Sequence, residues 1–155
     1  MKEIIRIKPH HFVDIITALG VGEVSFDPHP YGHAVHIVSE RVLRDHDTLL
    51  EIIELGADDI CQPCKHNLDG VCDDIMEPGV RPGAPRSKHE WTRRLDERWC
   101  ERLQIGQGDR LTAQELCKSL RDLAGDITDI YRETPDSLTA GRARDLKKGI
   151  GNYLK

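Results

Sequence analysis

The segment "CQPCKHNLDGVC" holds three of the five cysteines of this 155-residue chain, Cys61, Cys64 and Cys72, in the spacing C-x2-C-x7-C. Two thiolates about 4 Å apart repel by roughly 4 kcal/mol at an effective dielectric of 20. Gathered thiols therefore stay protonated, become oxidised or bind a cation. A C-x2-C pair can wrap one metal or one edge of a cluster, and the turn "NLDG" would bring Cys72 back as a third ligand.

Three kinds of site fit this pattern. An iron–sulfur cluster, most simply [4Fe–4S], takes cysteine thiolates on its irons. Zinc takes four tetrahedral ligands, usually from two C-x2-C-like pairs, of which this chain has only one. "CQPC" also carries the proline of a thioredoxin-type redox motif, but that motif follows a strand and opens a helix, whereas a helix is expected before it here. We favour the cluster and keep zinc and thiol redox chemistry as alternatives.

The fourth ligand of such a site is not local in the sequence. Cys100 is the best thiol candidate, whereas Cys117 lies in an apolar stripe, where cysteine behaves more often as a small hydrophobe. The predicted metal and cofactor ligands are Cys61, Cys64, Cys72 and Cys100. The nitrogen candidates are His66, His10 and His11, and Asp14 is a weaker oxygen candidate. The carboxylates that flank the cysteines are expected either to accept hydrogen bonds from the metal ligands or to be solvated, and we favour solvation. They are Asp58, Asp59, Asp73 and Asp74.

The stretch "KPHH" places His10 and His11 at the start of a predicted helix. The free N–H groups of a helix start favour an anion, and an all-thiolate cluster is negatively charged. The helix start would then face the cluster, with the histidines as ligands or as an acid and a base beside an open iron. The candidate catalytic residues are His10, His11 and Asp14. The plainer interpretation is that adjacent histidines cap or solvate the helix end.

A second group of histidines lies in "HPYGHAVH", at His29, His33 and His36. His33 and His36 are about one helical turn apart, a spacing that suits a metal. No carboxylate or third ligand lies at suitable local spacing. We expect these side chains to line a pocket.

The rest of the pattern predicts a mostly α-helical single domain with a short N-terminal strand. "EIIRIK" alternates as a strand, and Pro9 suits the first turn of a helix that Gly20 ends. "AVHIVSERVLRDHDTLLEIIELG" predicts one long helix, or two helices broken near Asp45 to Asp47. Between Cys61 and Arg86 there is no sustained period, so we expect a long, cysteine-bearing, metal-binding loop.

Further helices are expected after this loop. One carries the apolar stripe Trp91, Leu95, Trp99 and Leu103. Thr112 and Glu115 form a capping box that opens the next, whose apolar stripe continues until Thr134 and Pro135. We place the helical metal-binding domain at residues 1–135. Residues 136–155 form a basic, glycine-containing tail, expected as a loosely packed helix on the same domain.

Charge and hydropathy limit the classes of partner. The 22 basic and 27 acidic residues give a net charge of -5 and are mixed along the chain, so no nucleic acid partner is expected. The first twenty residues are too charged for a secretory signal, and no segment reaches membrane-spanning length. We expect a cytoplasmic protein with no membrane partner, where clustered thiols bind metal or do redox work. Its partner would be a small molecule or a redox protein, and the sequence does not indicate the oligomeric state.

Three stretches together, "IRIKPHHFVDII", "ADDICQPCKHNLDGVCDD" and "RLDERWCERLQIG", resemble a family of short bacterial and archaeal proteins known as domain of unknown function 1284. Its members have been presumed to bind an iron–sulfur cluster. The resemblance covers roughly residues 4–133, and the residues that it marks are His10, His11, Cys61, Cys64 and Cys72. The family commonly has a cysteine where this chain has Asp14, so Cys100 or Asp14 would have to be the fourth ligand.

Two functions follow from these residues. In the first, an enzyme or sulfur-handling protein has three cysteine ligands and an open iron lined by His10, His11 and Asp14. In the second, Cys100 closes a four-thiolate site in an electron-transfer or structural metal protein. A zinc that fixes the long loop is a third alternative.

Overall fold

The computed structural model describes residues 3–77 and 79–155, which are mostly α-helical, as predicted. The helices in these residues are α1 (Pro9–Val21), α2 (Val35–Arg44), α3 (Lys88–Leu103), α4 (Ala113–Leu123) and α5 (Asp136–Tyr153). The strands are β1 (Ile5–Ile7), β2 (Leu49–Ile52), β3 (Asn67–Leu68), β4 (Val71–Cys72) and β5 (Arg110–Thr112). Within the described residues, no helix combines the length and the apolar character needed to cross a membrane.

A small mixed sheet carries the start of the chain. β1 forms where a strand was predicted and pairs in parallel with β2, which pairs antiparallel with β5. The prediction of helix after Asp47 was wrong: α2 ends at Arg44, and the residues "LLEI" form β2 instead. Leu50 and Ile52 are fully buried on one face of this strand. Pairing with β1 and β5 therefore determines the extended conformation of this segment, although its apolar spacing also suits a helix.

The helix that begins at the capping box is shorter than predicted. Both hydrogen bonds of the box between Thr112 and Glu115 are present, which confirms the start of α4. The helix ends at Leu123 rather than near Thr134, and turns follow. Gly125 has a φ of +55°, and the Arg102 guanidinium donates to the carbonyl oxygens of residues 124 and 126. Because these carbonyl oxygens accept hydrogen bonds from outside the helix, α4 does not continue past Leu123.

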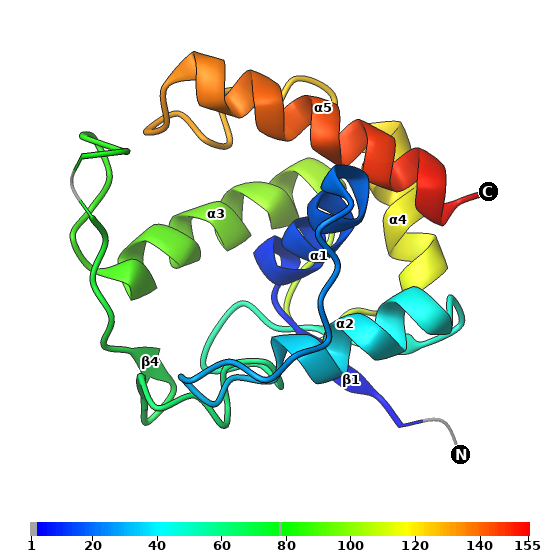
Figure 1. The fold of residues 1–155 in the computed structure, drawn as a ribbon, viewed down its shortest axis with the longest axis horizontal. Coiled ribbons are helices and arrows are strands. Elements are labelled where there is room, and N and C mark those ends of the chain that lie inside the picture. Colours follow the sequence, from blue (N-terminus) through cyan, green and yellow to red (C-terminus); the bar gives the residue numbers. More distant parts are fainter. Residues whose placement is uncertain (1–2, 78) are drawn as a thin grey trace.

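The C-terminal segment is a tightly packed helix, so the prediction of a loosely packed one was wrong. Figure 1 shows α5 running along the top of the molecule across α1, with α2 and β4 at the opposite side. The two helices cross at Gly20 and Gly149, so closely that a Cβ on Gly149 would overlap the carbonyl oxygen of Ile16. A Cβ on Gly20 would in turn overlap the carbonyl oxygen of Asp145. Glycine at both positions lets the backbones touch.

The cysteine segment turns back on itself in a hairpin. β3 and β4 are joined by Asp69 and Gly70, whose φ values are +51° and +90°, as a two-residue Asp-Gly turn requires. The pairing sets Asn67 opposite Cys72. The return of the chain at "NLDG" is thereby confirmed. The segment from Cys61 to Arg86 thus contains regular structure, including an isolated bridge between Ile75 and Ser87.

We predict that Gly149→Ala lowers the free energy of unfolding by about 3 kcal/mol, because the added methyl group must push α5 away from the backbone of α1. Gly151→Ala is the matched control. It lies in the same helix with no atom near its added Cβ, and should raise stability by about 0.5–1 kcal/mol. Urea unfolding followed by circular dichroism measures both. Equal effects of the two substitutions would show that the crossing is not tight.

Candidate functional site

Two buried carboxylates hold the N-terminus of α1. Asp58 accepts a hydrogen bond from the backbone N–H of Lys8, and Asp96 accepts one from that of His10, each at 2.8 Å. Asp58 is 0% exposed and Asp96 is 1% exposed. These two side chains supply negative charge at the helix start, where the sequence prediction had placed the anionic cluster. Of the two uses expected for Asp58, the structure shows the less favoured one: it is a buried hydrogen-bond acceptor and is not solvated.

The same two carboxylates orient the paired histidines. The Nδ1 of His10 lies 2.8 and 2.9 Å from the Asp96 oxygens, and the Nδ1 of His11 lies 2.7 Å from Asp58. The ring centroids of the two histidines are 4.1 Å apart. His10 is buried and His11 is half-buried. A carboxylate on Nδ1 fixes the ring and leaves Nε2 for a metal or a substrate, as in many metal and catalytic sites.

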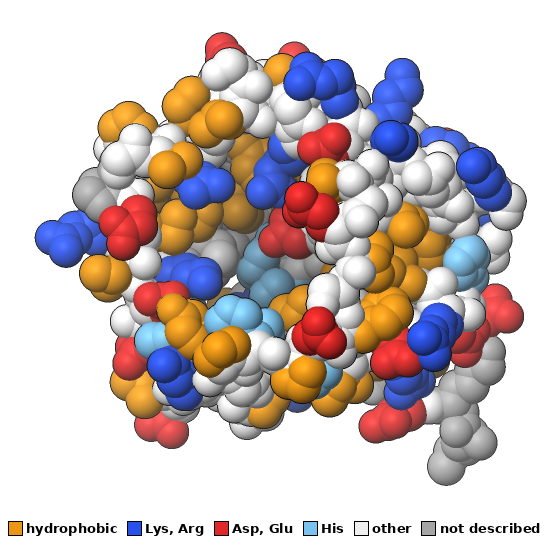
Figure 2. Space-filling model, in the orientation of Figure 1, with side chains coloured by type: hydrophobic (Ala, Val, Ile, Leu, Met, Phe, Trp, Pro, Cys, Tyr) orange, Lys and Arg blue, Asp and Glu red, His pale blue; other side chains and the backbone are white. Residues whose placement is uncertain are grey.

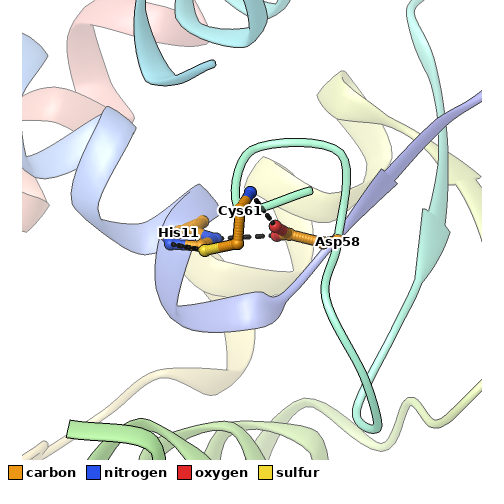
Figure 3. Close-up of side chains that lie close together, drawn as sticks. All are labelled: His11, Asp58 and Cys61. Carbon is orange, nitrogen blue, oxygen red and sulfur yellow. Dashed lines mark hydrogen bonds and ion pairs between the residues drawn. The ribbon is translucent and has the colours of Figure 1, made fainter. Parts of the chain in front are cut away.

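Asp58 also joins His11 to the first cysteine of the triad (Figure 3). It accepts a hydrogen bond from the backbone N–H of Cys61 at 3.0 Å, while the Nε2 of His11 lies 3.8 Å from the Cys61 Sγ. One ligand atom from each of the three side chains lies within 4.8 Å of the others. The order thiol, imidazole and carboxylate is that of a nucleophile with its base and orienting group, and it is equally a set of metal ligands.

The charges of this group favour a protonated thiol. Burial alone would lower the pKa of His11, but the Asp58 carboxylate outweighs it and the pKa is raised. Burial would raise the pKa of Asp58, yet His11 and the backbone N–H groups hold it well below its usual range. Burial, and then Asp58, raise the pKa of the Cys61 thiol to about 12. A thiolate at neutral pH would therefore need a cation beside it.

A cavity of about 170 Å³ brings the cysteine triad and the paired histidines together. Its wall includes Cys61, Cys64, Cys72, His10 and His11. Figure 2 shows this face of the molecule hollowed, with histidine side chains in the hollow. Five of the residues predicted for the site thus face one space, although they come from α1, the segment after β2, and β4.

The thiols lie around this cavity rather than at one point. In the described part of the chain, no three cysteines have all their sulfur atoms within 4.8 Å of one another. The backbone N–H of His66 donates to the Cys64 Sγ at 3.5 Å, and the His66 ring is held by Asp73 at 2.7 Å. Burial raises the pKa of the Cys72 thiol as well.

Two predicted site residues lie elsewhere among the described residues. Cys100 does not line the cavity; it is buried in the core on α3, where burial and the Glu54 carboxylate raise the pKa of its thiol. Asp14 is exposed and pairs with Arg142 of α5 at 2.8 Å. Cys117 is fully buried, as expected for a core residue.

The second group of histidines does line a pocket. A cavity of about 420 Å³ has His29, His33 and His36 on its wall, together with His11 and Asp14. His33 and His11 also line the cavity of the cysteines, so the two spaces adjoin.

Sequence reasoning missed two residues of the site, Asp96 and Lys8, and it favoured solvation for Asp58. Asp96 had a detectable signal, because it lies between Leu95 and Trp99 of the apolar stripe and one turn before Cys100. A carboxylate on the buried side of a helix needs a partner inside the protein.

Comparisons with known proteins give one match. A family model described as "Protein of unknown function (DUF1284)" matches residues 30–132, which include the cysteine triad but not His10 or His11. A search of curated proteins and a search of solved structures found no match.

We predict that Asp58→Asn lowers the free energy of unfolding by about 3–5 kcal/mol, because it breaks a buried ion pair that also caps α1. The control is Asp73→Asn, which removes a similar carboxylate–histidine pair whose Asp73 side chain is 46% exposed; its cost should stay below about 1 kcal/mol. Chemical denaturation of the metal-free proteins measures both. A small effect at Asp58 would mean that the pair is not the structural centre of the site.

The stability of the metal-free protein should also depend on pH through His11. Its pKa is raised above the ordinary value of 6.5 on folding, so its contribution is complete below pH 6.5 and is lost as the pH rises through the folded pKa. Asp58 stays ionised throughout this range. We expect the free energy of unfolding to fall on this rise in pH in the native sequence and in Asp73→Asn, but not in Asp58→Asn. An unchanged slope in Asp58→Asn would exclude this origin.

Proposed function

The chain belongs to the DUF1284 family, whose description assigns no reaction, and from the geometry of the site we propose that the protein binds an iron–sulfur cluster, most simply [4Fe–4S]. The cysteines that would hold it are Cys61, Cys64 and Cys72. The observation that carries the proposal is the placement of all three thiols on the wall of one cavity.

The three thiols as they stand do not match the ligand spacing of a single tetrahedral metal ion. Tetrahedral Zn–S bonds of about 2.3 Å would set any two sulfurs about 3.8 Å apart. The three thiols do not form a group within 4.8 Å among the described residues. In a cluster each cysteine binds a different iron, so its sulfurs lie further apart around a shared centre.

The chemistry of the donors agrees with a resident cation. A thiol with a pKa of about 12, such as Cys61, becomes a thiolate at neutral pH only when a metal replaces its proton. The N–H of His66 on the Cys64 sulfur is the kind of hydrogen bond that tunes thiolate-bound irons. The wall is thus suited to hold thiolates that a metal has deprotonated.

The residues available for the fourth ligand position of the cluster favour an open iron over a four-thiolate site. Cys100 is buried in the core and does not line the cavity, whereas His10 and His11 do. When bound, a cluster with an open iron supplies a Lewis-acidic and redox-active metal. The chain itself would supply two imidazoles, each oriented by its own buried carboxylate and able to hold or pass a proton at Nε2. We therefore propose an enzyme or sulfur-handling protein rather than a simple electron carrier.

A single zinc ion on His11, Asp58 and Cys61 is the second candidate, because one ligand atom of each lies within 4.8 Å of the others. Three protein ligands and one open position describe a catalytic zinc site. The hydrogen bonds argue against it. Asp58 already accepts from Lys8, Ile60 and Cys61, and it faces the Nδ1 of His11, which leaves its oxygens little freedom to bind a metal.

The test is anaerobic purification, followed by a visible spectrum and by iron, sulfide and zinc analysis of the same sample. We expect brown protein with about four irons and four sulfides per chain. Serine at Cys61, Cys64 or Cys72 should abolish or sharply lower the loading, while Cys100→Ser and the core control Cys117→Ser keep it. Colourless protein with one zinc per chain would support the second candidate. Loss of the cluster in Cys100→Ser alone would favour the four-thiolate alternative.

A further inference from the structure

We infer that the cavity of the cysteines binds a small carboxylate, and that the Lys8 ammonium is its anchor. As a statement about the substrate of the cluster this rests on the proposed function. The anion site itself rests on the side chains of the wall alone.

Lys8 lines the cavity and has no carboxylate partner among the described residues. It is 7% exposed, and no carboxylate of the described residues lies within 4.0 Å of its ammonium. Its backbone N–H is bound to Asp58, but the same carboxylate pairs with the His11 ring. A cationic side chain on a cavity wall that has no carboxylate partner is free to pair with a bound anion. The arrangement is that of a binding residue whose partner comes from outside the chain.

Lys8 shares the wall of the cavity with other residues of the site. Cys61, His10 and His11 line the same cavity as Lys8. An anion beside Lys8 would thus lie next to Cys61 and close to the paired histidines.

The other charges of the wall are already paired. Lys88 lies 3.6 Å from Asp74, which is the one carboxylate on the described wall. The carboxylates of Asp58 and Asp96 are engaged with His11 and His10 and do not line the cavity. In a chain of net charge -5, this leaves an unmatched positive charge at the cavity. Such a focus of positive charge attracts a small anion.

The wall suits a carboxylate better than a phosphate. Phosphate sites commonly use the N–H groups of a helix start or the fork of an arginine. Here Asp58 and Asp96 occupy the start of α1, and no arginine lines the described wall. The cavity of about 170 Å³ admits only a small group, while the adjoining space of about 420 Å³ can take the remainder of a longer molecule.

The experiment measures binding of malonate to the anaerobically purified protein by isothermal titration calorimetry, with uncharged malonamide as the ligand control. Lys8→Met should weaken malonate binding about 10- to 100-fold, because it removes a charge-assisted contact. Lys8→Arg should keep most of the affinity. Lys118→Met is the matched control on the exposed side of α4 and should leave binding unchanged. Malonamide should not bind.

Parallel iron and sulfide analysis separates the two proposals. A loaded cluster with no malonate binding, or with equal binding in Lys8→Met, overturns the carboxylate site and leaves the cluster standing. Malonate binding to a protein without iron supports the anion site while the cluster fails. A third outcome is that Lys8→Met loses its iron and sulfide while the native protein does not bind malonate. Lys8 would then balance the negative charge of the cluster, and the proposal of a carboxylate site would be overturned. If Lys8→Met does not fold by circular dichroism, competition between phosphate and malonate in Lys8→Arg is the deciding measurement. A Kd for malonate far below that for phosphate supports the carboxylate site. Equal values, or tighter binding of phosphate, overturn it.

Discussion

The capping of α1 by two buried aspartates is the constraint on which the site depends. A helix start has free N–H groups, and in this protein they are met by Asp58, from the segment after β2, and by Asp96, from α3. Each carboxylate also receives the Nδ1 of one histidine. In each case the carboxylate that positions the imidazole is therefore also the one that joins the start of α1 to the rest of the protein.

The surrounding fold keeps this junction in register. β1 ends just before Lys8 and pairs in parallel with β2, and the N–H of Asp59 donates to the carbonyl oxygen of Arg6. This pairing places Asp58, in the chain after β2, beside the start of α1. From the other end, α5 lies against α1 where Gly20 and Gly149 meet. A shift of α1 along its axis would break the capping bonds and the glycine contact together.

Local signals in the sequence predicted the local parts of the site. Asp-Gly between short apolar runs specifies the hairpin that returns Cys72, and Pro9 with Gly20 frames α1 closely. The buried partners were not predictable in the same way. Aspartate is rarely buried, so solvation was the favoured expectation for Asp58 beside the cysteines. Its local partners are the N–H groups of Ile60 and Cys61, but the partners that bury it in the site come from the approach of α1, with His11 47 positions away. β2 was missed because its pairing is also long-range.

The cost of burying these groups bears on the choice between a catalyst and an electron carrier. Two desolvated carboxylates, Asp58 and Asp96, stabilise a fold less than apolar side chains of similar size often would. An electron carrier needs only the cysteines and a suitable environment for the metal, and gains nothing from imidazoles aimed at the same cavity. A site that transfers protons or binds an anion requires such groups in fixed positions. The pairing of His10 with Asp96 and of His11 with Asp58 therefore supports the proposed open iron over a closed four-thiolate centre.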